Sequence, residues 1–405
     1  MSDPTRDAPR ARPVDVVVIG AGQAGLSAAY HLRRRGFVAP AEAAPGARTY
    51  VVLDGEAGPG GAWRHRWRSL RMATVNGIHD LPGMALPDPP ACEPANEAIP
   101  DYFARYEREL DLAVVRPVMV RAVRRSPADA ALLHDHEEGL GGPDEVGGGA
   151  HAAEERDGDG VGAGGEGGRL LVETDAGAWG ARAVINATGT WRKPFWPRYP
   201  GQLDFRGTQL HVADYERAED FAGRHTVVVG GGISAVQLLD EISRVTSTTW
   251  VTRREPLWRE DDFDREAGRR AVALVEERVR AGLPPRSVVS VTGLLWTPAL
   301  RAARERGALE RHPMFTRIEP DGVRMADGSF QPAQAILWAT GFRAQLDHLA
   351  PLGLRGHGGG IAVDGTRVRA EPRVHLVGYG PSSSTVGANR AGRDAVREIT
   401  ALLDA

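Results

Sequence analysis

Residues 14–25 have the sequence VDVVVIGAGQAG, and this stretch decides the fold. The nearly continuous run of β-branched residues from Val14 to Ile19 predicts a strand that is buried on both faces of a parallel sheet. The glycines that follow fit the pattern Gly-x-Gly-x-x-Gly, and a helix is predicted behind them from Leu26 to Arg35. A strand, a glycine turn and a helix in this order form the phosphate-binding corner of a βαβ unit.

Each glycine of this turn has its own expected task. Gly20 permits the tight turn, Gly22 lets the backbone approach a pyrophosphate, and Gly25 lets the helix pack on the strand. The next predicted strand, from Tyr50 to Leu53, ends at Asp54, whose carboxylate can accept hydrogen bonds from a ribose. The start of the helix offers free N–H groups to the phosphates. The sequence therefore predicts a dinucleotide site, and the alternative is a glycine-rich turn in some other α/β protein.

The chain repeats this arrangement once. A strand from Thr226 to Val229 leads into a second turn with a small residue at its third position, made by Gly230, Gly232, Ser234 and Ala235. The strand after this turn ends in Arg253 and Arg254 instead of an acid. Arginine pairs bidentately with a 2′-phosphate, whereas an acid favours a free 2′-hydroxyl. The two arginines therefore favour NADP over NAD, and the alternative is a pair of solvated surface side chains.

Two dinucleotide units in one chain imply two dinucleotides that exchange electrons, namely FAD on the unit that ends in Asp54 and NADPH on the other. Each unit also has a closing strand and an Ala-Thr-Gly turn, the second of which contains Thr340. The predicted fold is α/β, with two Rossmann-like dinucleotide-binding domains, the NADPH domain being inserted into the FAD domain. The expected division is a disordered tail at 1–13, the FAD domain at 14–190 and 341–405, and the NADPH domain at 191–340.

One segment differs in kind from the rest. Residues 135–168 hold 13 glycines and 10 acidic residues against one arginine, with almost no large apolar side chain. Such a composition cannot bury a core, so we expect a disordered acidic loop at the tip of a hairpin. The chain carries a net charge of −3 and this segment −9, which leaves +6 on the remainder. A mildly basic body suits anionic cofactors.

Composition excludes several classes of protein. The 405 residues suit two or three domains, and a net charge of −3 argues against a nucleic-acid binder. No apolar run is long enough to span a membrane, and the first residues lack the apolar region of a secretory signal, so a cytoplasmic location is expected. The single cysteine, Cys92, excludes an internal disulfide, a CxxC redox pair and a cysteine-built metal site, and no metal is expected.

The most specific element lies between the two glycine turns, where the chain reads Phe205-x-Gly207-x-x-x-His211-x-x-x-Tyr215. Together with those turns and their spacing, it resembles the flavin-containing monooxygenases. These are class B flavoprotein oxygenases that include the plant auxin-forming enzymes and many bacterial homologues. The resemblance covers nearly the whole chain. The Baeyer–Villiger branch would carry Trp-Pro or Trp-Asp where this chain has Tyr215 and Glu216, so the sulfur- or nitrogen-oxygenating and auxin-forming branches fit better.

The resemblance also implies roles for residues outside the glycine turns. Gly61 and Trp63, of the stretch Gly60-Gly61-x-Trp63, would lie beside the flavin. Arg64 and Arg66 would face the pyrophosphate or the nicotinamide, unless they only begin a basic surface helix. Gly378 ends the last strand, before a helix whose start, with serine and threonine as N-caps, would point at the flavin. The candidate catalytic residues are Asn76 and His211, the latter by positioning the linker and NADP and not by proton transfer.

The function that the resemblance implies is an FAD-dependent monooxygenase that uses NADPH and O₂. Oxygen would pass through a C4a-(hydro)peroxyflavin to a soft sulfur or nitrogen nucleophile, or to a carbonyl. The partners would be a small-molecule substrate and O₂, and a homodimer stays open. Two alternatives remain: an NADPH-dependent flavin reductase or oxidase without oxygen transfer, and a non-turnover FAD/NADP-binding protein.

Overall fold

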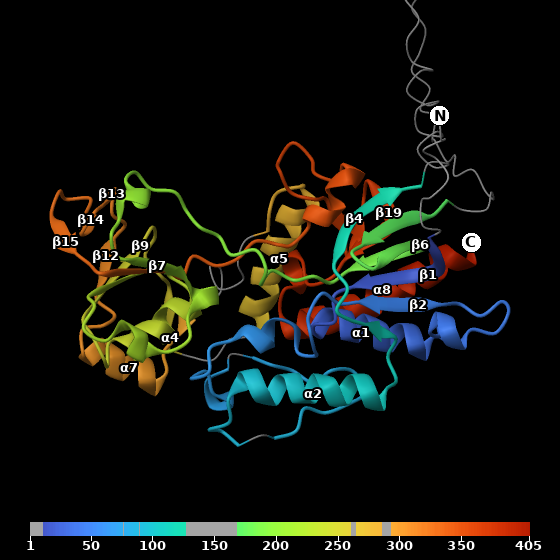
Figure 1. The fold of residues 1–405 in the computed structure, drawn as a ribbon, viewed down its shortest axis with the longest axis horizontal. Coiled ribbons are helices and arrows are strands. Elements are labelled where there is room, and N and C mark those ends of the chain that lie inside the picture. The colour runs from blue at the N-terminus through green and yellow to red at the C-terminus, as the bar shows by residue number, and fades with distance from the viewer. Residues whose placement is uncertain (1–10, 76, 89, 127–167, 261–264, 286–292) are drawn as a thin grey trace, which may run out of the picture.

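The computed structural model describes residues 11–75, 77–88, 90–126, 168–260, 265–285 and 293–405, with only the backbone described for 265–272. Asn76, the first ten residues of the expected tail and the acidic segment up to residue 167 therefore lie outside the described residues. The chain forms two lobes that lie side by side along its longest axis, and the first and last elements, β1 and α8, belong to the same lobe (Figure 1). In the described part, no helix combines the length and the apolar character that crossing a membrane requires.

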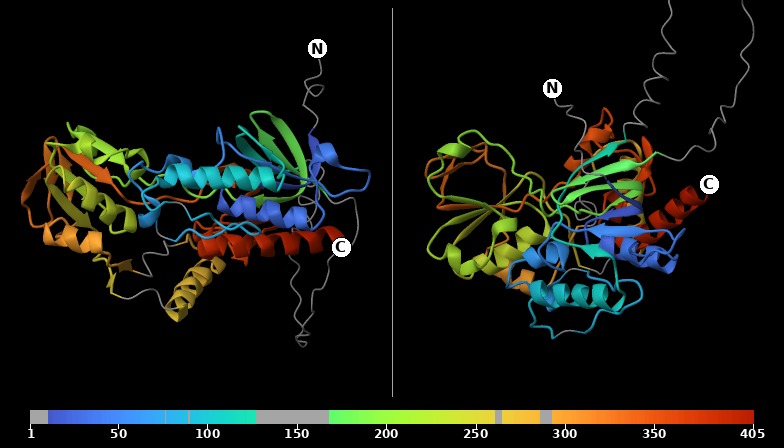
Figure 2. Two further views of the ribbon diagram at one scale, coloured as in Figure 1. Left: turned by 90° about the horizontal axis from the view of Figure 1, so that it is seen from below. Right: turned by 45° about the vertical axis from the view of Figure 1, so that its right-hand side comes forward.

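The first lobe is built on a nine-stranded sheet whose main path has the order β17-β18-β19-β6-β1-β2-β3. The strands β1, β2, β6 and β19 are parallel, so their carboxyl ends meet at one edge. Helices α1, α2 and α8 lie in layers beside this sheet (Figure 2). The elements are β1 (Arg12–Ile19), α1 (Gln23–Arg34), β2 (Tyr50–Leu53), α2 (Ala95–Glu109), β3 (Val114–Val115), β4 (Val120–Arg125), β5 (Leu170–Thr174), β6 (Gly177–Asn186), β17 (Val363–Asp364), β18 (Arg367–Val368), β19 (Glu371–Leu376) and α8 (Thr385–Asp404).

The second lobe holds a five-stranded parallel sheet of order β12-β9-β8-β16-β7 and a small antiparallel sheet of β13, β14 and β15. Its elements are β7 (Thr208–His211), β8 (Thr226–Val229), α4 (Ile233–Ile242), β9 (Thr248–Thr252), β10 (Trp258–Arg259), β11 (Leu294–Leu295), α7 (Pro298–Glu305), β12 (Arg311–Pro313), β13 (Arg317–Glu319), β14 (Gly322–Arg324), β15 (Phe330–Pro332) and β16 (Ala335–Trp338). The second glycine turn therefore leads from β8 into α4, as the sequence predicts.

Helix α5 (Arg265–Arg280) packs on the first lobe, although the strands before and after it belong to the second. The expected division places it in the NADPH domain, but Val275 and Val279 are buried in a cluster with side chains of the first lobe, such as Leu346 and Tyr379. The backbone supports this placement, because Gly360 donates a hydrogen bond to the carbonyl of Gly282, 3.0 Å away. The inserted segment thus returns to cover the first lobe.

Helix α2 begins at Ala95, five residues before Pro100. A proline inside a helix removes one backbone hydrogen bond, so the sequence favours a start after Pro100. In the structure Pro100 lies within α2, and the extra turn is held by the fully buried side chains of Ala95 and Ile99. Tertiary packing outweighs the local preference of the proline here.

Two linkers cross between the lobes and pair with each other. The first linker, residues 187–207, follows β6, and the second linker, residues 339–346, follows β16. Pro194 and Phe342 form an antiparallel bridge. The threonine hydroxyls of the two Ala-Thr-Gly turns each bond to the opposite linker: Thr188 donates to the carbonyl of Gln345 at 2.6 Å, and Thr340 donates to the carbonyl of Phe195 at 2.5 Å. The connection between the lobes is therefore a hydrogen-bonded pair of strands and not two independent tethers.

We predict that residues 135–168 are dispensable for folding and catalysis. Strands β4 and β5 pair antiparallel up to Arg125 and Leu170, and Ser126 donates a hydrogen bond to the carbonyl of Arg169 at 3.0 Å. The hairpin thus closes without the acidic segment. A deletion bridged by a short Gly-Ser turn should keep the flavin absorbance, the melting temperature and NADPH oxidation. Loss of the fold on deletion would show that this segment packs, against its composition.

Candidate functional site

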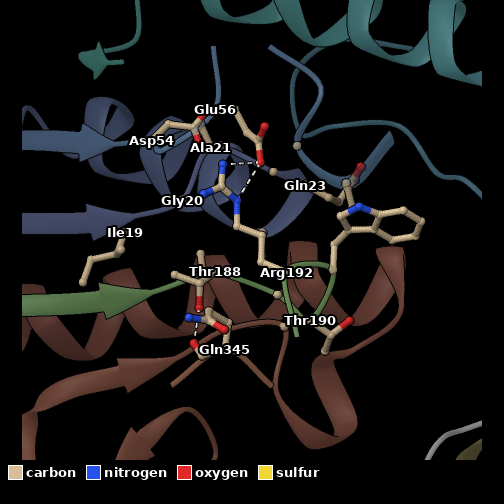
Figure 3. A pocket seen from close by; sticks show the side chains of 18 of the residues that line it. Ile19, Gly20, Ala21, Gln23, Asp54, Glu56, Thr188, Thr190, Arg192 and Gln345 are labelled. Carbon is tan, nitrogen blue, oxygen red and sulfur yellow. Dashed lines mark hydrogen bonds and ion pairs between the residues drawn. The ribbon is translucent and has the colours of Figure 1, made fainter. Parts of the chain in front are cut away.

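A cavity of about 310 Å³ lies at the carboxyl ends of the parallel strands of the first lobe. Ligands of open α/β sheets bind at this edge. Figure 3 shows its walls: the first glycine turn, the loop after β2 and the turn after β6 face one another across the space. Residues from the start of α8 complete the wall, so both ends of the chain contribute.

The first glycine turn has the geometry that dinucleotide binding requires. A β-carbon on Gly25 would lie 1.8 Å from the carbonyl oxygen of Gly20, and one on Gly20 would lie 2.7 Å from the carbonyl oxygen of Ala187. Both positions therefore exclude a side chain because the backbone packs closely. A β-carbon on Gly22 would meet nothing within 4 Å, and Gly22 lines the cavity. Gly22 is thus the position where a ligand can approach the backbone.

The second turn repeats this pattern in the second lobe. A β-carbon on Gly230 would lie 2.2 Å from the carbonyl oxygen of Ala339, in the second Ala-Thr-Gly turn. Gly232, like Gly22, is the N-cap of its helix and would meet nothing within 4 Å. Ser234 lies in the first turn of α4. The two lobes therefore present glycine turns of equivalent backbone geometry.

The start of α1 has polar groups that await a ligand. Its N-cap Gly22 provides no side-chain cap, so the first N–H groups are free to bind phosphate oxygens. Gln23, which lines the cavity, donates to the carbonyl of His79 at 3.2 Å and to Asn389 at 3.1 Å. Its Oε1 atom is buried and has no hydrogen-bond partner among the described residues. An orphaned acceptor beside a free helix start fits a bound FAD.

Asp54 lies at the expected ribose position and lines the same cavity. Its carboxylate is only 5% exposed, and its Oδ2 atom accepts a hydrogen bond from Arg116 at 3.0 Å. Arg116 is also held by both carboxylate oxygens of Glu107. The arginine orients Asp54 and balances its charge, while no described side chain bonds to Oδ1. This oxygen can therefore accept a hydrogen bond from a ribose.

Arg192 crosses the cavity mouth from the first linker (Figure 3). Its guanidinium donates to Glu56 at 3.0 Å and to the carbonyl of Gly55 at 2.8 Å, both in the loop after β2. Glu56 also contacts His65 at 2.9 Å. Burial opposes ionisation of this carboxyl, but the hydrogen bonds from Arg192 and His65 lower its pKa overall. The first linker is thereby hydrogen-bonded to the loop after β2, which begins with Asp54.

The structure separates the residues of the Gly60-Gly61-x-Trp63 stretch. Gly61 packs on the first glycine turn, since its β-carbon would lie 3.0 Å from the Cα of Gly22, and Trp63 lines the cavity. Arg64 is exposed and lies outside the cavity, where it donates to the carbonyl of Pro59 at 3.1 Å. Gly61 and Trp63 thus form part of the cavity wall. Arg64 instead bonds to the backbone of its own turn and does not line the cavity.

The last strand and helix meet the cavity as the sequence predicts. Gly378 lines it with a left-handed φ of 75°. Ser384 is the N-cap of α8 and accepts a hydrogen bond from Gly387 at 3.1 Å, and Thr385 donates to the carbonyl of Gly77 at 2.8 Å. The start of α8, with its positive dipole end, therefore forms one wall of the cavity.

His211 is fully buried, and its ring nitrogens both bond to backbone. Nδ1 accepts from the N–H of Ala213 at 3.1 Å, so Nε2 carries the proton and donates to the carbonyl of Gly341 at 3.1 Å. Burial lowers the pKa of His211, although the bond to Gly341 opposes this, so the ring is neutral. Phe342 packs against its ring edge-to-face. His211 thus holds the second linker through Gly341, and its role in positioning NADP stays a prediction.

Arg253 and Arg254 follow β9 directly, and both side chains are exposed. No described carboxylate forms an ion pair with either. A third arginine lies beside them: Arg311, on the neighbouring strand β12, donates to the hydroxyl of Thr252 at 2.9 Å. The carboxyl edge of β9 therefore gathers three arginines, a residue type that pairs well with phosphate groups.

Several cavity residues were missed by the sequence analysis. Gln345 lies in the second linker and His348 follows it. His348 donates to Asn186 at 2.7 Å, and burial lowers the pKa of His348 to about 4. Arg192 lies in a linker that no motif covers. Gln23 lies inside the first glycine turn and Thr188 inside the first Ala-Thr-Gly turn. The sequence therefore marked both positions, but the prediction considered the glycines of the motif and not these side chains. No sequence pattern marks the linker residues, because only the crossing of the linkers in the folded protein brings them to the cavity.

Comparisons with known proteins agree with this geometry. A family model described as pyridine nucleotide-disulphide oxidoreductase matches residues 164–283. The chain is 36% identical to a flavin-containing monooxygenase from Stenotrophomonas maltophilia, with a TM-score of 0.72 over 97% of this chain and 99% of that one. It is 24% identical to the indole-3-pyruvate monooxygenase YUCCA4 of Oryza sativa subsp. japonica, over 95% of this chain and 87% of that one. The uncharacterized oxidoreductase CzcO-like of Geobacillus kaustophilus is 23% identical, over 81% of this chain and 80% of that one.

Proposed function

The chain belongs to the flavin-containing monooxygenase family, and on this premise we propose that it oxygenates a small molecule with a soft sulfur or nitrogen atom, or a carbonyl group. It is an NADPH-dependent flavoprotein monooxygenase, with FAD and NADPH as its cofactors. The balanced reaction consumes NADPH, a proton, O₂ and the substrate, and yields NADP⁺, water and the substrate with one added oxygen atom.

The observation that carries the proposal is the pair of matched glycine turns. Gly22 and Gly232 are both open to a ligand, while Gly20 and Gly230 pack on equivalent Ala-Thr-Gly turns. The first turn belongs to a strand pair that ends in Asp54, and the second to a pair that ends in Arg253. Each lobe can therefore hold one dinucleotide, FAD in the first and NADPH in the second.

The residues of the chain bind, orient and shield. The free N–H groups of α1 would hold the FAD diphosphate, and Asp54 would hold a ribose. Trp63 and Trp191 line the cavity and would exclude water from its contents. His211 fixes the second linker beside Thr340. When bound, FAD supplies the chemistry that the side chains lack: it accepts a hydride from NADPH and then activates O₂.

The test follows the oxygen atom. Holoenzyme should be reduced with NADPH without air and then mixed with ¹⁸O₂ and an organic sulfide such as thioanisole. We expect a sulfoxide with one ¹⁸O and less than one equivalent of H₂O₂ per NADPH. Stoichiometric H₂O₂ with every sulfide, amine and ketone offered would contradict the proposal and favour an oxidase without oxygen transfer.

We predict that His211→Ala weakens retention of NADP⁺ after flavin reduction. Without the bond to Gly341 the second linker is held less firmly. Water then reaches the site where reduced flavin reacts with O₂ more easily. In stopped-flow measurements the oxidised-flavin absorbance should return severalfold sooner than in wild type, while the rate of flavin reduction changes less. His225→Ala is the matched control, because His225 bonds to Ser247 and Thr249 at the opposite end of the second lobe's strands. Equal timing in His211→Ala and wild type would remove the positioning role.

A further inference from the structure

One guanidinium, that of Arg66, lies against two tryptophans of the cavity wall and has no anionic partner among the described residues. The Cζ atom of Arg66 lies 4.5 Å from the ring centroid of Trp191 and 5.5 Å from that of Trp63. Both tryptophans line the cavity. The Nε atom of Arg66 is buried and has no hydrogen-bond partner, and no described carboxylate pairs with this side chain.

A partly buried cation without a counter-charge is unfavourable unless a ligand supplies one. Burial lowers the pKa of Arg66 to about 10, so the guanidinium stays charged at neutral pH. The nearby acid, Glu56, is already engaged by Arg192 and His65. Arg116 shows the contrast, because burial lowers its pKa but Glu107 and Asp54 raise it overall. Arg66 is thus a cation for which the described part of the chain provides no anionic partner.

Arg66 also lies where the two lobes meet. The next residue, Trp67, packs edge-to-face on Tyr215, with ring centroids 6.2 Å apart. Tyr215 in turn donates to Glu241 on α4 at 3.0 Å. Trp191, which contacts the guanidinium, stacks on His65 and on Phe342, and Phe342 lies in the second linker. The guanidinium is therefore placed at the junction that a hydride donor, a flavin and a substrate must share.

The phosphates of both cofactors have other receptors. The free starts of α1 and α4 suit the two pyrophosphates, and Arg253, Arg254 and Arg311 gather where the 2′-phosphate is expected. The substrate is the remaining source of an anion. Carboxylate is the common organic anion that matches the planar fork of a guanidinium.

We propose that Arg66 binds a carboxylate of the oxygenated substrate. The substrate class is then an organic acid whose body is aromatic or otherwise apolar, because the rings of Trp63 and Trp191 lie against the guanidinium and line the cavity. This inference rests on the proposed monooxygenase function and adds to it the chemical class of the substrate and a residue that selects it.

The experiment compares an acid with its own ester. The probes are 4-(methylthio)phenylacetic acid and its methyl ester, which share one sulfide and differ in charge. Dissociation constants are measured from the change in flavin absorbance of the oxidised holoenzyme, and kcat/KM is measured from sulfoxide formation. The variants are Arg66→Met, which removes the charge, Arg66→Lys, which keeps it, and Arg68→Met as control, because Arg68 is a neighbouring and largely exposed arginine.

We expect the wild type to prefer the acid. Arg66→Met should weaken binding of the acid roughly 10- to 100-fold and leave the ester unchanged, since a charged hydrogen-bonded pair is lost. Arg66→Lys should keep part of the preference, and Arg68→Met should behave as wild type. Equal binding of acid and ester by the wild type, or equal loss of both in Arg66→Met, would overturn the inference.

Two further outcomes have distinct meanings. A raised KM for NADPH in Arg66→Met, with acid binding unchanged, would assign the anion to the coenzyme and overturn the substrate proposal. If Arg66→Met loses its flavin, the acid preference of Arg66→Lys decides, and no preference there would also overturn it. Failure of the wild type to oxygenate any sulfide, amine or ketone would instead contradict the proposed function, whereas oxygenation of the ester as efficiently as the acid contradicts only this inference.

Discussion

Replacing Gly22 with alanine is expected to yield a folded protein that purifies without its yellow colour. The added methyl group would meet no protein atom within 4 Å, so the fold should keep its melting temperature. The same methyl group would project into the space where a pyrophosphate must approach the backbone. We expect most of the flavin absorbance near 450 nm to be lost, measured per polypeptide after purification.

Three matched glycine variants make this result specific. Gly232→Ala should keep the flavin and lose NADPH binding, because Gly232 is the equivalent open position of the second lobe. Gly356→Ala should change neither, since its β-carbon also meets nothing within 4 Å and Gly356 lies outside both turns. Gly25→Ala should fail to fold, because its β-carbon would collide with the carbonyl of Gly20. Full flavin content in Gly22→Ala would mean that the first turn does not bind FAD.

The second large effect concerns coenzyme choice. Replacing both Arg253 and Arg254 with alanine should lower the ratio of kcat/KM for NADPH to that for NADH. A charge-assisted contact to the 2′-phosphate contributes about 1.5–3 kcal/mol, which corresponds to roughly 10- to 150-fold. The value for NADH should change little, because NADH has no 2′-phosphate to lose. Steady-state kinetics with both coenzymes measures the ratio.

The control for this variant is Arg206→Ala. Arg206 is another exposed arginine of the second lobe, with a side chain that is 75% exposed and a long ion pair to Asp321 of 3.8 Å. It should leave the coenzyme ratio unchanged. A ratio that also stays unchanged in the double variant would show that Arg253 and Arg254 are ordinary surface cations.

The sequence predicts the parts of this site that depend on backbone geometry. Only glycine fits where a β-carbon would lie 1.8 Å or 2.2 Å from a carbonyl oxygen, as at Gly25 and Gly230, so the positions of glycines reveal the turns. The β-branched strands β1 and β8 and the start of α8 are likewise local in origin. His211 was recognised because its spacing from Phe205 and Tyr215 belongs to a family pattern.

The rest depends on contacts between distant segments, which no local pattern records. Arg192 reaches Glu56 across 136 positions of sequence, and His348 reaches Asn186 across 162. Arg64 shows the opposite case, because a cation close to a motif turns back to the carbonyl of Pro59. Asn76 lies outside the described residues, so its role in catalysis stays a prediction.

The cavity walls come from segments near the beginning and near the end of the chain. They are therefore synthesised at different times. The glycine turn and Asp54 are made early, but Gly378 and the start of α8 are made only after the entire second lobe. Domains generally fold as they emerge from the ribosome. The inserted lobe can therefore fold around β8 and β9 while the first lobe still lacks a wall. We therefore expect this enzyme to acquire FAD late in its maturation, after its coenzyme-binding lobe is complete.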